Sequence, residues 1–354
     1  MDCQVKCGKV VKVTDFTKRQ ELLVEINGRL EKAINFPQLT GKCQVKDEVV
    51  VNTTAVALDL GTGGTHFVMA VVGKNRELEA TDGHIMKLRY TPNQGRVLSV
   101  EEEASPDHQL MKEVDSLNRI PVVVGTLHSM LAPVCLGFKE LASEKKIVYL
   151  MSDGAALPLG LSKQVEVLKE VGLIEQTITF NHAFGGDLEA VNVFSALLAA
   201  KHVCQADLAV ILMGPGVVGT NTKWGTSALE QGIFLNAVDS LAGQPIGTLR
   251  VSFADPRNRH QGISHHCLTA LQHVVKCKCH LALPFSLKTH PLISDQLSKL
   301  HQHQIHWVDT EPYISVLENS PFELRSMGRT VAEDPYFFQA AFAAGMLAGQ
   351  LVPE

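Results

Sequence analysis

Short, continuous runs of apolar residues recur along the C-terminal two thirds of the chain, with helical patterns between them. Five of these runs lie at residues 122–124, 147–151, 176–180, 208–213 and 249–253. Continuous apolar runs of this length are typical of strands buried on both faces of a parallel sheet. Their alternation with helices predicts the α/β class, with a doubly wound, mainly parallel, Rossmann-like sheet over residues 120–354.

The N-terminal part shows a different pattern, in which short strand-like runs are separated by turn residues about every ten positions. These runs lie at residues 9–14, 21–26, 49–52, 55–60 and 66–72. Asn27 and Gly28 follow the second run and give the signature of a type I′ hairpin turn. We therefore predict a small β-barrel or β-sandwich domain over residues 1–75 and an irregular connector over residues 76–119.

Charge and composition narrow the class of protein. The 354 residues carry a net charge of −5 without a strongly basic segment, so nucleic acid is not an expected partner. The chain has no run of about 18 apolar residues and its start does not resemble a signal peptide, so no membrane is expected either. The 8 cysteines include no C-x-x-C pair, which favours reduced thiols and a cytoplasmic location.

Polar and glycine-rich loops follow all five predicted strands. Because the carboxyl ends of parallel strands lie along one edge of a sheet, we expect these loops to line a common ligand crevice. The candidate residues are His128 after the first strand, Asp153 after the second, His182, Gly185, Gly186 and Asp187 after the third, Gly214, Gly216, Gly219 and Thr220 after the fourth, and Asp255, Arg257, Arg259 and His260 after the fifth.

The fourth loop, residues 214–219, fits the pattern G-x-G-x-x-G, in which glycines let backbone N–H groups approach a phosphate. The predicted helix start at Ser227 lies well beyond Gly219, and no acidic residue ends a second strand about twenty residues later, which disfavours a dinucleotide site. An anion-binding loop and a simple turn both fit the pattern. Arg257 and Arg259 could clamp a phosphate or carboxylate, or could form a solvated basic loop.

The third loop offers residues for proton transfer or for metal binding. His182 and Asp187 could act as a general acid–base pair, with Asp153 as a further catalytic residue. The same imidazole and carboxylate are suitable metal ligands, with Asp255 as a third candidate. The chain contains no H-x-x-x-H or H-E-x-x-H motif, and Asp187 could instead cap the helix that follows it. The sequence identifies no cofactor.

Several longer motifs resemble one known family. They lie at residues 52–56, 83–92, 153–158, 182–195 and 252–255. These motifs are similar to those of a prokaryotic family catalogued as domain of unknown function 3866, from about residue 8 to the C-terminus. The resemblance implies a bacterial source, but it implies no activity, cofactor or catalytic residue.

The expected function is that of an enzyme acting on a small anionic molecule, phosphorylated or nucleotide-like, at the carboxyl edge of the sheet. The fourth loop and the two arginines would hold the anion, and His182 with Asp187 would move a proton or hold a metal. Two alternatives stay open, a non-catalytic ligand-binding or regulatory protein and a metal-dependent hydrolase. The last helical segment, residues 334–351, is apolar on all sides and is predicted to pack in the core or at a homodimer interface.

Overall fold

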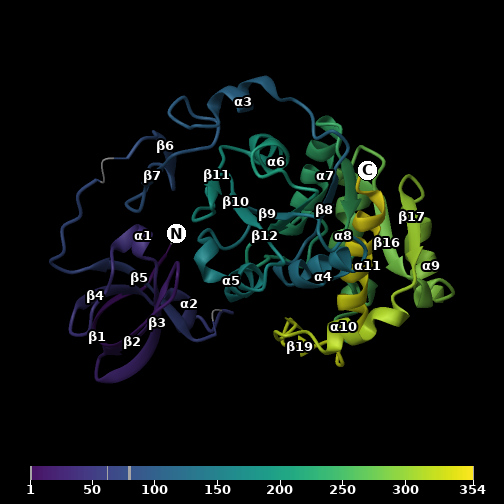
Figure 1. Cartoon of the computed structure of the whole chain (residues 1–354). Coiled ribbons are helices and arrows are strands. Elements are labelled where there is room, and N and C mark those ends of the chain that lie inside the picture. Colours follow the sequence, from purple (N-terminus) through teal and green to yellow (C-terminus); the bar gives the residue numbers. More distant parts are fainter. Residues whose placement is uncertain (1, 62, 79–80, 354) are drawn as a thin grey trace.

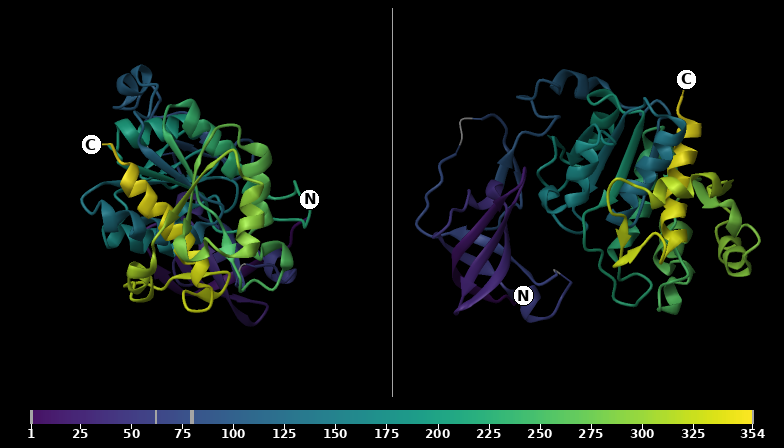
Figure 2. Two further views of the ribbon diagram at one scale, coloured as in Figure 1. Left: turned by 90° about the vertical axis from the view of Figure 1, so that its right-hand side faces the viewer. Right: turned by 60° about the horizontal axis from the view of Figure 1, so that its bottom comes forward.

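The computed structural model describes residues 2–61, 63–78 and 81–353 (Figure 1). It contains a small N-terminal barrel and a larger α/β unit built on a parallel sheet, so the predicted fold class is confirmed. The connector runs from the barrel to the α/β unit along one side of the molecule, as Figure 2 also shows. None of the helices in the described ranges is long and apolar enough to cross a membrane.

The N-terminal barrel is a closed sheet of five strands. They are β1 (Val5–Asp15), β2 (Gln20–Ile26), β3 (Arg29–Asn35), β4 (Glu48–Asn52) and β5 (Thr65–Val71). The order around the barrel is β1-β2-β3-β5-β4, a Greek-key closure of the kind found in OB-folds. Alternate residues of β2, namely Leu22, Val24 and Ile26, fill its interior. Asn27 and Gly28 have φ angles of 51° and 76°, which confirms the predicted type I′ turn.

The strand predicted at residues 55–60 is wrong. Part of this segment forms the short helix α2 (Thr54–Ala57), which is followed by a turn. The side chain of Asn52 accepts a hydrogen bond from the N–H of Thr54 at 3.1 Å, which turns the chain away from β4. A second one-turn helix, α1 (Pro37–Thr40), precedes β4.

The connector contains a small hairpin that is fixed to the edge of the large sheet. The hairpin consists of β6 (Ile85–Lys87) and β7 (Gly95–Val97), and the helix α3 (His108–Glu113) follows it in the connector. The side chain of Lys87 is only 3% exposed and forms an ion pair with Glu189 at 3.2 Å. Its Nζ also donates to the carbonyl oxygen of Ala190 at 3.1 Å. This buried ammonium group joins the connector to the α/β unit.

The large sheet has eight strands, and all neighbouring pairs run parallel. In sheet order the strands are β11 (Leu188–Glu189), β10 (Gln176–Thr179), β9 (Ile147–Ser152), β12 (Leu208–Met213), β8 (Pro121–Val124), β13 (Gln244–Gly247), β16 (His280–Pro284) and β17 (Gln304–Val308). The central strands β8, β9 and β12 are buried at every residue. This burial on both faces explains why their sequences are continuous apolar runs.

Helices cover both faces of this sheet. One face packs against α4 (Leu131–Leu141), α5 (Lys163–Glu170), α10 (Ile314–Glu318) and α11 (Pro335–Leu351). The other packs against α6 (Val193–His202), α7 (Glu230–Ser240), α8 (His265–Thr269) and α9 (Pro291–Ser298). The short helical turns are η1 (His128–Met130), η2 (Leu159–Leu161), η3 (Ser227–Leu229), η4 (Asn258–His260), η5 (Ala270–Val274), η6 (Phe285–Leu287) and η7 (Glu311–Tyr313).

The apolar C-terminal helix α11 lies in the core, where it packs against α4 (Figure 1). Glycines allow the two helices to approach closely. A Cβ on Gly137 of α4 would collide with the carbonyl oxygen of Phe342, and one on Gly345 of α11 would collide with that of Val134. The prediction that this helix packs in the core is therefore confirmed. Its apolar composition is explained by that packing and does not require a homodimer interface.

The fifth predicted strand, at residues 249–253, is wrong. The sheet strand is β13, which ends at Gly247, so the chain leaves the sheet before this apolar run begins. Within the run only β14 (Val251–Ser252) is extended, and it pairs antiparallel with β15 (Gly262–Ile263). Leu249 is buried nonetheless, in the core on the α7 side of the sheet. A final hairpin is made by β18 (Arg325–Ser326) and β19 (Arg329–Thr330).

Candidate ligand-binding site

The carboxyl edge of the sheet has two positions at which neighbouring connections diverge. The chain leads from β9 to β10 and from β12 to β13, in opposite directions along the sheet, although β9 and β12 are neighbours. β8 and β13 form a second such pair, because the chain leads from β8 to β9 and from β13 to β16. Ligands of open α/β sheets bind at such switch points, so a ligand is expected at the loops after these strands.

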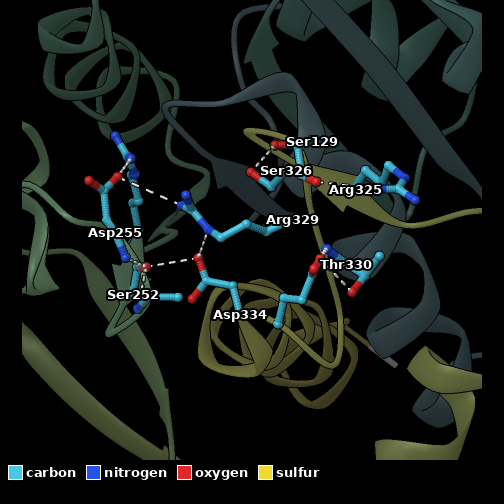
Figure 3. Close-up of polar contacts among 12 residues, drawn as sticks. Ser129, Ser252, Asp255, Arg325, Ser326, Arg329, Thr330 and Asp334 are labelled. Carbon is cyan, nitrogen blue, oxygen red and sulfur yellow. Dashed lines mark hydrogen bonds and ion pairs between the residues drawn. The ribbon is translucent and has the colours of Figure 1, made fainter.

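Three arginines surround one buried carboxylate in the loop after β13. Nε and Nη2 of Arg257 donate to the carboxylate of Asp255 at 2.9 and 2.8 Å, and Nη2 of Arg250 donates to it at 2.8 Å. Nη2 of Arg329 lies 3.7 Å from the same group (Figure 3). The hydrogen bonds from Arg257 are the main reason why the pKa of Asp255 is held well below its usual range, against the effect of burial.

The third arginine comes from the C-terminal hairpin, which extends to the loop after β8 and to β14. Nε of Arg329 donates to Asp334 at 2.9 Å, and the same carboxylate accepts a hydrogen bond from the hydroxyl of Ser252 at 2.8 Å. The hydroxyls of Ser326 and Ser129 lie 2.9 Å apart (Figure 3). These contacts fix the hairpin to the loop after β8, through Ser129, and to β14, through Asp334 and Ser252.

The cluster carries more positive than negative charge. The three guanidinium groups face two carboxylates, those of Asp255 and Asp334. The Asp255 side chain is 0% exposed, whereas that of Arg257 is 39% exposed, so Arg257 presents its remaining N–H groups to solvent. Arg259 is exposed two residues further on and adds another positive charge.

Three histidine rings lie beside the arginines, in η4 and at the start of α8. The ring centroid of His260 is 5.2 Å from those of His265 and His266, which are 4.1 Å from each other. Burial, followed by the charge of Arg250, lowers the pKa of His260 to about 3, and burial with the adjoining His265 lowers the pKa of His266 to about 4. These imidazoles are therefore neutral at neutral pH.

Some buried polar atoms near this edge have no hydrogen-bond partner in the described part of the chain. They are Nε2 of His265, Oγ1 of Thr248 and Oε1 of Gln231. The amide of Gln231 is oriented by its Nε2, which donates to the carbonyl oxygens of Val124 and Thr248 at 2.9 and 2.8 Å. Buried polar atoms without partners are costly, and a bound polar molecule or water is the usual explanation.

The glycine-rich fourth loop lies against this histidine cluster. A Cβ on Gly219 would stand 3.0 Å from the ring of His266, and the hydroxyl of Thr226 lies 3.5 Å from Nδ1 of that ring. Thr226 then caps η3, so the G-x-G-x-x-G segment does not open a helix. Gly216 and Thr220 are exposed. The structure thus brings the fourth and fifth loops together, as their common edge predicts, without the geometry of a dinucleotide fingerprint.

The second and fourth loops also meet, at the switch point between β9 and β12. A Cβ on Gly214 would stand 2.5 Å from the carbonyl oxygen of Ala156, so this glycine permits a close approach of the backbones. The hydroxyl of Ser152 donates to Glu230 at 2.8 Å. Burial, helped by the charge of Asp153, raises the pKa of Glu230. A carboxyl group with a raised pKa at a switch point is suited to proton transfer.

His182 lies close to Asp153, but its ring does not contact that carboxylate. The backbone N–H of His182 donates to Asp153 at 3.1 Å, and the side chain of Asn181 donates to the same carboxylate at 3.1 Å. Nδ1 of the His182 ring accepts from the N–H of Leu88 in the connector at 3.1 Å. Nη2 of Arg89, also in the connector, lies 3.4 Å from Nε2 of the same ring, so both ring nitrogens face hydrogen-bond donors.

Asp187 lies away from these residues, and the predicted pairing of His182 with Asp187 is not observed. Its carboxylate accepts from the N–H of Thr177 at 2.8 Å and forms an ion pair with Lys169 at 2.5 Å. Thr177 is the second residue of β10, whereas His182 follows the end of that strand. Asp187 also does not cap α6, because Asn192 does so.

The two glycines of the third loop serve local structure. The N–H of Gly185 donates to Glu189 at 2.7 Å, and the N–H of Gly186 donates to the hydroxyl of Thr179 at 3.0 Å. A Cβ on Gly186 would stand 2.5 Å from the carbonyl oxygen of Leu188. These glycines allow the loop to fold back onto β10.

Comparison with protein-family models shows which family the chain belongs to. A model of proteins of unknown function, DUF3866, matches residues 32–345. The chain belongs to the DUF3866 family. No curated protein and no solved structure matches it significantly. The description of the DUF3866 family gives no activity.

The candidate metal ligands of this DUF3866 chain do not come together. His182, Asp187 and Asp255 lie in three different places, and each carboxylate is committed to cations or backbone donors. Within the ranges that the structure describes, no group of three or more His, Cys, Asp or Glu is placed to hold a metal ion. The described cysteines are all free thiols.

Several polar residues of the DUF3866 site were not candidates from the sequence. Arg329 of the C-terminal hairpin and Asp334, which directly precedes α11, lie more than 70 residues after Asp255, and no local pattern connects them. Glu230 follows Ser227 at the spacing of a helix N-terminus, so the sequence suggests a local role for it and does not predict its contact with Ser152. His128, which was a candidate, lies on the α4 side of the sheet, where Ser162 and Tyr149 contact it.

Proposed function

We propose that this protein is an enzyme acting on a small anionic molecule, phosphorylated or nucleotide-like, bound at the carboxyl edge of the sheet. The observation that carries the proposal is the convergence of Arg250, Arg257 and Arg329 on the buried Asp255. A buried carboxylate of this kind fixes the direction of each guanidinium group. The free N–H groups and the excess positive charge suit a phosphate or a carboxylate.

The neighbouring histidines supply a means of proton transfer. His260 and His266 are neutral partly because arginine charges lie close to them. A bound anion would offset those charges and raise the pKa of the imidazoles, so that they could exchange protons when a substrate is present. Glu230, with its raised pKa, would serve as a second proton donor beside Gly154.

The proposal is tested by anion binding to the purified chain. Inorganic phosphate, pyrophosphate and a panel of nucleotides and sugar phosphates are screened by thermal shift, and hits are measured by calorimetry. The double variant Arg257→Ala/Arg259→Ala should lose most of the affinity for the best hit, about tenfold or more. Arg325→Ala is the matched control, because Arg325 lies on the same hairpin as Arg329 (Figure 3) but its side chain pairs with Glu323 at the surface.

Unchanged affinity in the double variant would overturn the assignment of the anion site. Turnover is followed separately by phosphorus NMR of each ligand that binds. A tight ligand recovered chemically unchanged after long incubation would overturn the enzymatic part and favour a binding or regulatory protein.

A further inference from the structure

A second set of polar side chains lies on the opposite face of the sheet from the histidine cluster. Oγ of Ser162 lies 2.6 Å from Nε2 of His128, and Nδ1 of the same ring lies 3.1 Å from the hydroxyl of Tyr149. That hydroxyl lies 3.5 Å from the carbonyl oxygen of Leu212. The four groups form a continuous series of hydrogen bonds.

The direction of every hydrogen bond in this series follows from its last member. A carbonyl oxygen only accepts, so the hydroxyl of Tyr149 donates to Leu212 at 3.5 Å and accepts a hydrogen bond from the N–H at Nδ1 of His128. Nε2 of the ring then carries a lone pair, and Ser162 donates its hydroxyl proton to it. Burial lowers the pKa of His128 to about 4, which keeps the ring neutral in neutral solution. This is the arrangement of a serine with its general base.

Ser162 is also the N-cap of α5, where it accepts a hydrogen bond from the N–H of Val165 at 3.1 Å. The cap uses one lone pair of the hydroxyl and does not need a histidine. The helix end, however, places N–H groups and a positive partial charge beside Oγ, which stabilise negative charge as it develops on a reacting serine. The cap and the His128 contact are therefore compatible with each other.

Ser162 lines a cavity of about 210 Å³ between the barrel and the α/β unit. The turn between β1 and β2 forms one wall with Thr17, Lys18 and Arg19. The α/β unit contributes Leu159, Gly160, Val165 and charged side chains, among them Glu166, Lys169, Glu170 and Asp187. Most of these charges are paired, because Arg19 contacts Glu166 at 3.0 Å and both lysines contact Asp187.

We propose that Ser162 is the nucleophile and His128 the general base of a second catalytic site, which takes small uncharged acyl esters. The paired charges leave no strong field for a charged substrate, and the cavity of about 210 Å³ has room for a short acyl ester. This site goes beyond the anion site, because it lies under the barrel and shares no residue with the arginine cluster.

The reaction follows from the hydrogen bonds already present. Oγ of Ser162 forms a bond to the carbonyl carbon of the ester, its proton passes to Nε2 of His128, and the C–O bond to the alcohol breaks. The departing alkoxide takes that proton and leaves as the alcohol. Water then attacks the acyl-serine, gives one proton to His128, and releases the carboxylic acid as Ser162 recovers its hydrogen.

The test uses diisopropyl fluorophosphate on the full chain, followed by mass spectrometry. Reaction would form an Oγ–P bond, release fluoride and pass the proton to His128. Trypsin cleavage after Lys146 and Lys163 yields the peptide 147–163, which contains both Ser152 and Ser162, so fragmentation is needed to locate the adduct. We expect one adduct per chain, on Ser162.

Variants separate reactivity from folding. Ser162→Ala removes the nucleophile together with the cap, and its melting temperature is measured alongside. His128→Gln keeps the capping serine and should lower the labelling rate at least tenfold. Ser195→Ala, in the capping box of α6, should react at the wild-type rate. An unlabelled wild-type chain, an adduct on another residue, or wild-type labelling of His128→Gln would each overturn the proposal.

Discussion

Arg257 holds the buried carboxylate of Asp255 through both Nε and Nη2, at 2.9 and 2.8 Å. The same carboxylate also accepts a hydrogen bond from Arg250, which lies between β13 and β14. Nη2 of Arg329, in the C-terminal hairpin, lies 3.7 Å from it. One aspartate therefore links the loop after β13 to the C-terminal hairpin, two segments that are distant in sequence. Its removal should affect the stability of the protein as well as ligand binding.

Asp255→Asn should lower the free energy of unfolding by about 3 kcal/mol, because breaking a buried ion pair leaves uncompensated guanidinium charges. The measurement is urea denaturation at pH 7. Asp295→Asn is the control, since its side chain is 68% exposed and pairs with Lys299, and it should change stability by less than about 0.5 kcal/mol. Equal effects of the two substitutions would contradict the structural role of Asp255.

Folding stability should decrease as the pH falls from about 6.5 towards 4. The pKa of His260 is lowered to about 3 and that of His266 to about 4, so the unfolded chain binds more protons than the native chain over this interval. The stabilisation is fully present above the unfolded pKa of about 6.5 and is lost as the pH approaches the folded values. His260→Gln should make urea midpoints less dependent on pH, and a midpoint that is higher at pH 5 than at pH 7 would be inconsistent with buried neutral histidines.

Binding of pyrophosphate should raise the pKa of His266 by about one unit or more, because the anion offsets neighbouring arginine charges. The measurement is an NMR titration of labelled imidazoles with and without the anion. The exposed His301, far along the chain, serves as an internal control whose titration should not move. Parallel shifts of both residues would indicate a general ionic effect and would count against a local site.

Gly137→Ala should lower the free energy of unfolding by about 3 kcal/mol, because the new Cβ collides with the backbone of Phe342 where α4 meets α11. Urea denaturation measures the effect. Gly95→Ala is the control, since no atom lies within 4 Å of the position of its Cβ. A stability loss in Gly137→Ala no larger than in the control would show that the two helices can separate at little cost.

The sequence predicted those strands of the sheet that are buried on both faces. β8, β9 and β12 are buried on both faces, so their sequences are continuous apolar runs. β13 (Gln244–Gly247) contains Gln, Pro and Gly and carries no such signature. The apolar run after it is buried by the helices beyond the edge of the sheet, so burial alone did not identify the strand.

The candidate site was predicted only in part, from the rule that the carboxyl ends of parallel strands lie along one edge of a sheet. The rule placed Gly219 and His260 on one edge, and the structure places them around His266. It failed for Asp187 because the two-residue β11 begins directly after it, so Asp187 precedes a strand and lies towards the other edge. It could not find Arg329, whose approach to Asp255 depends on the tertiary path of the C-terminal hairpin.

The anion site is tested most directly by the position of a bound oxyanion. A crystal of the full chain grown with tungstate, an analogue of phosphate, would show the metal of the oxyanion by its anomalous scattering. The account predicts a strong anomalous peak within about 4 Å of the outward N–H groups of Arg257, between that residue and the histidine cluster. Tungstate bound at full occupancy elsewhere, with no peak beside Arg257, would contradict it.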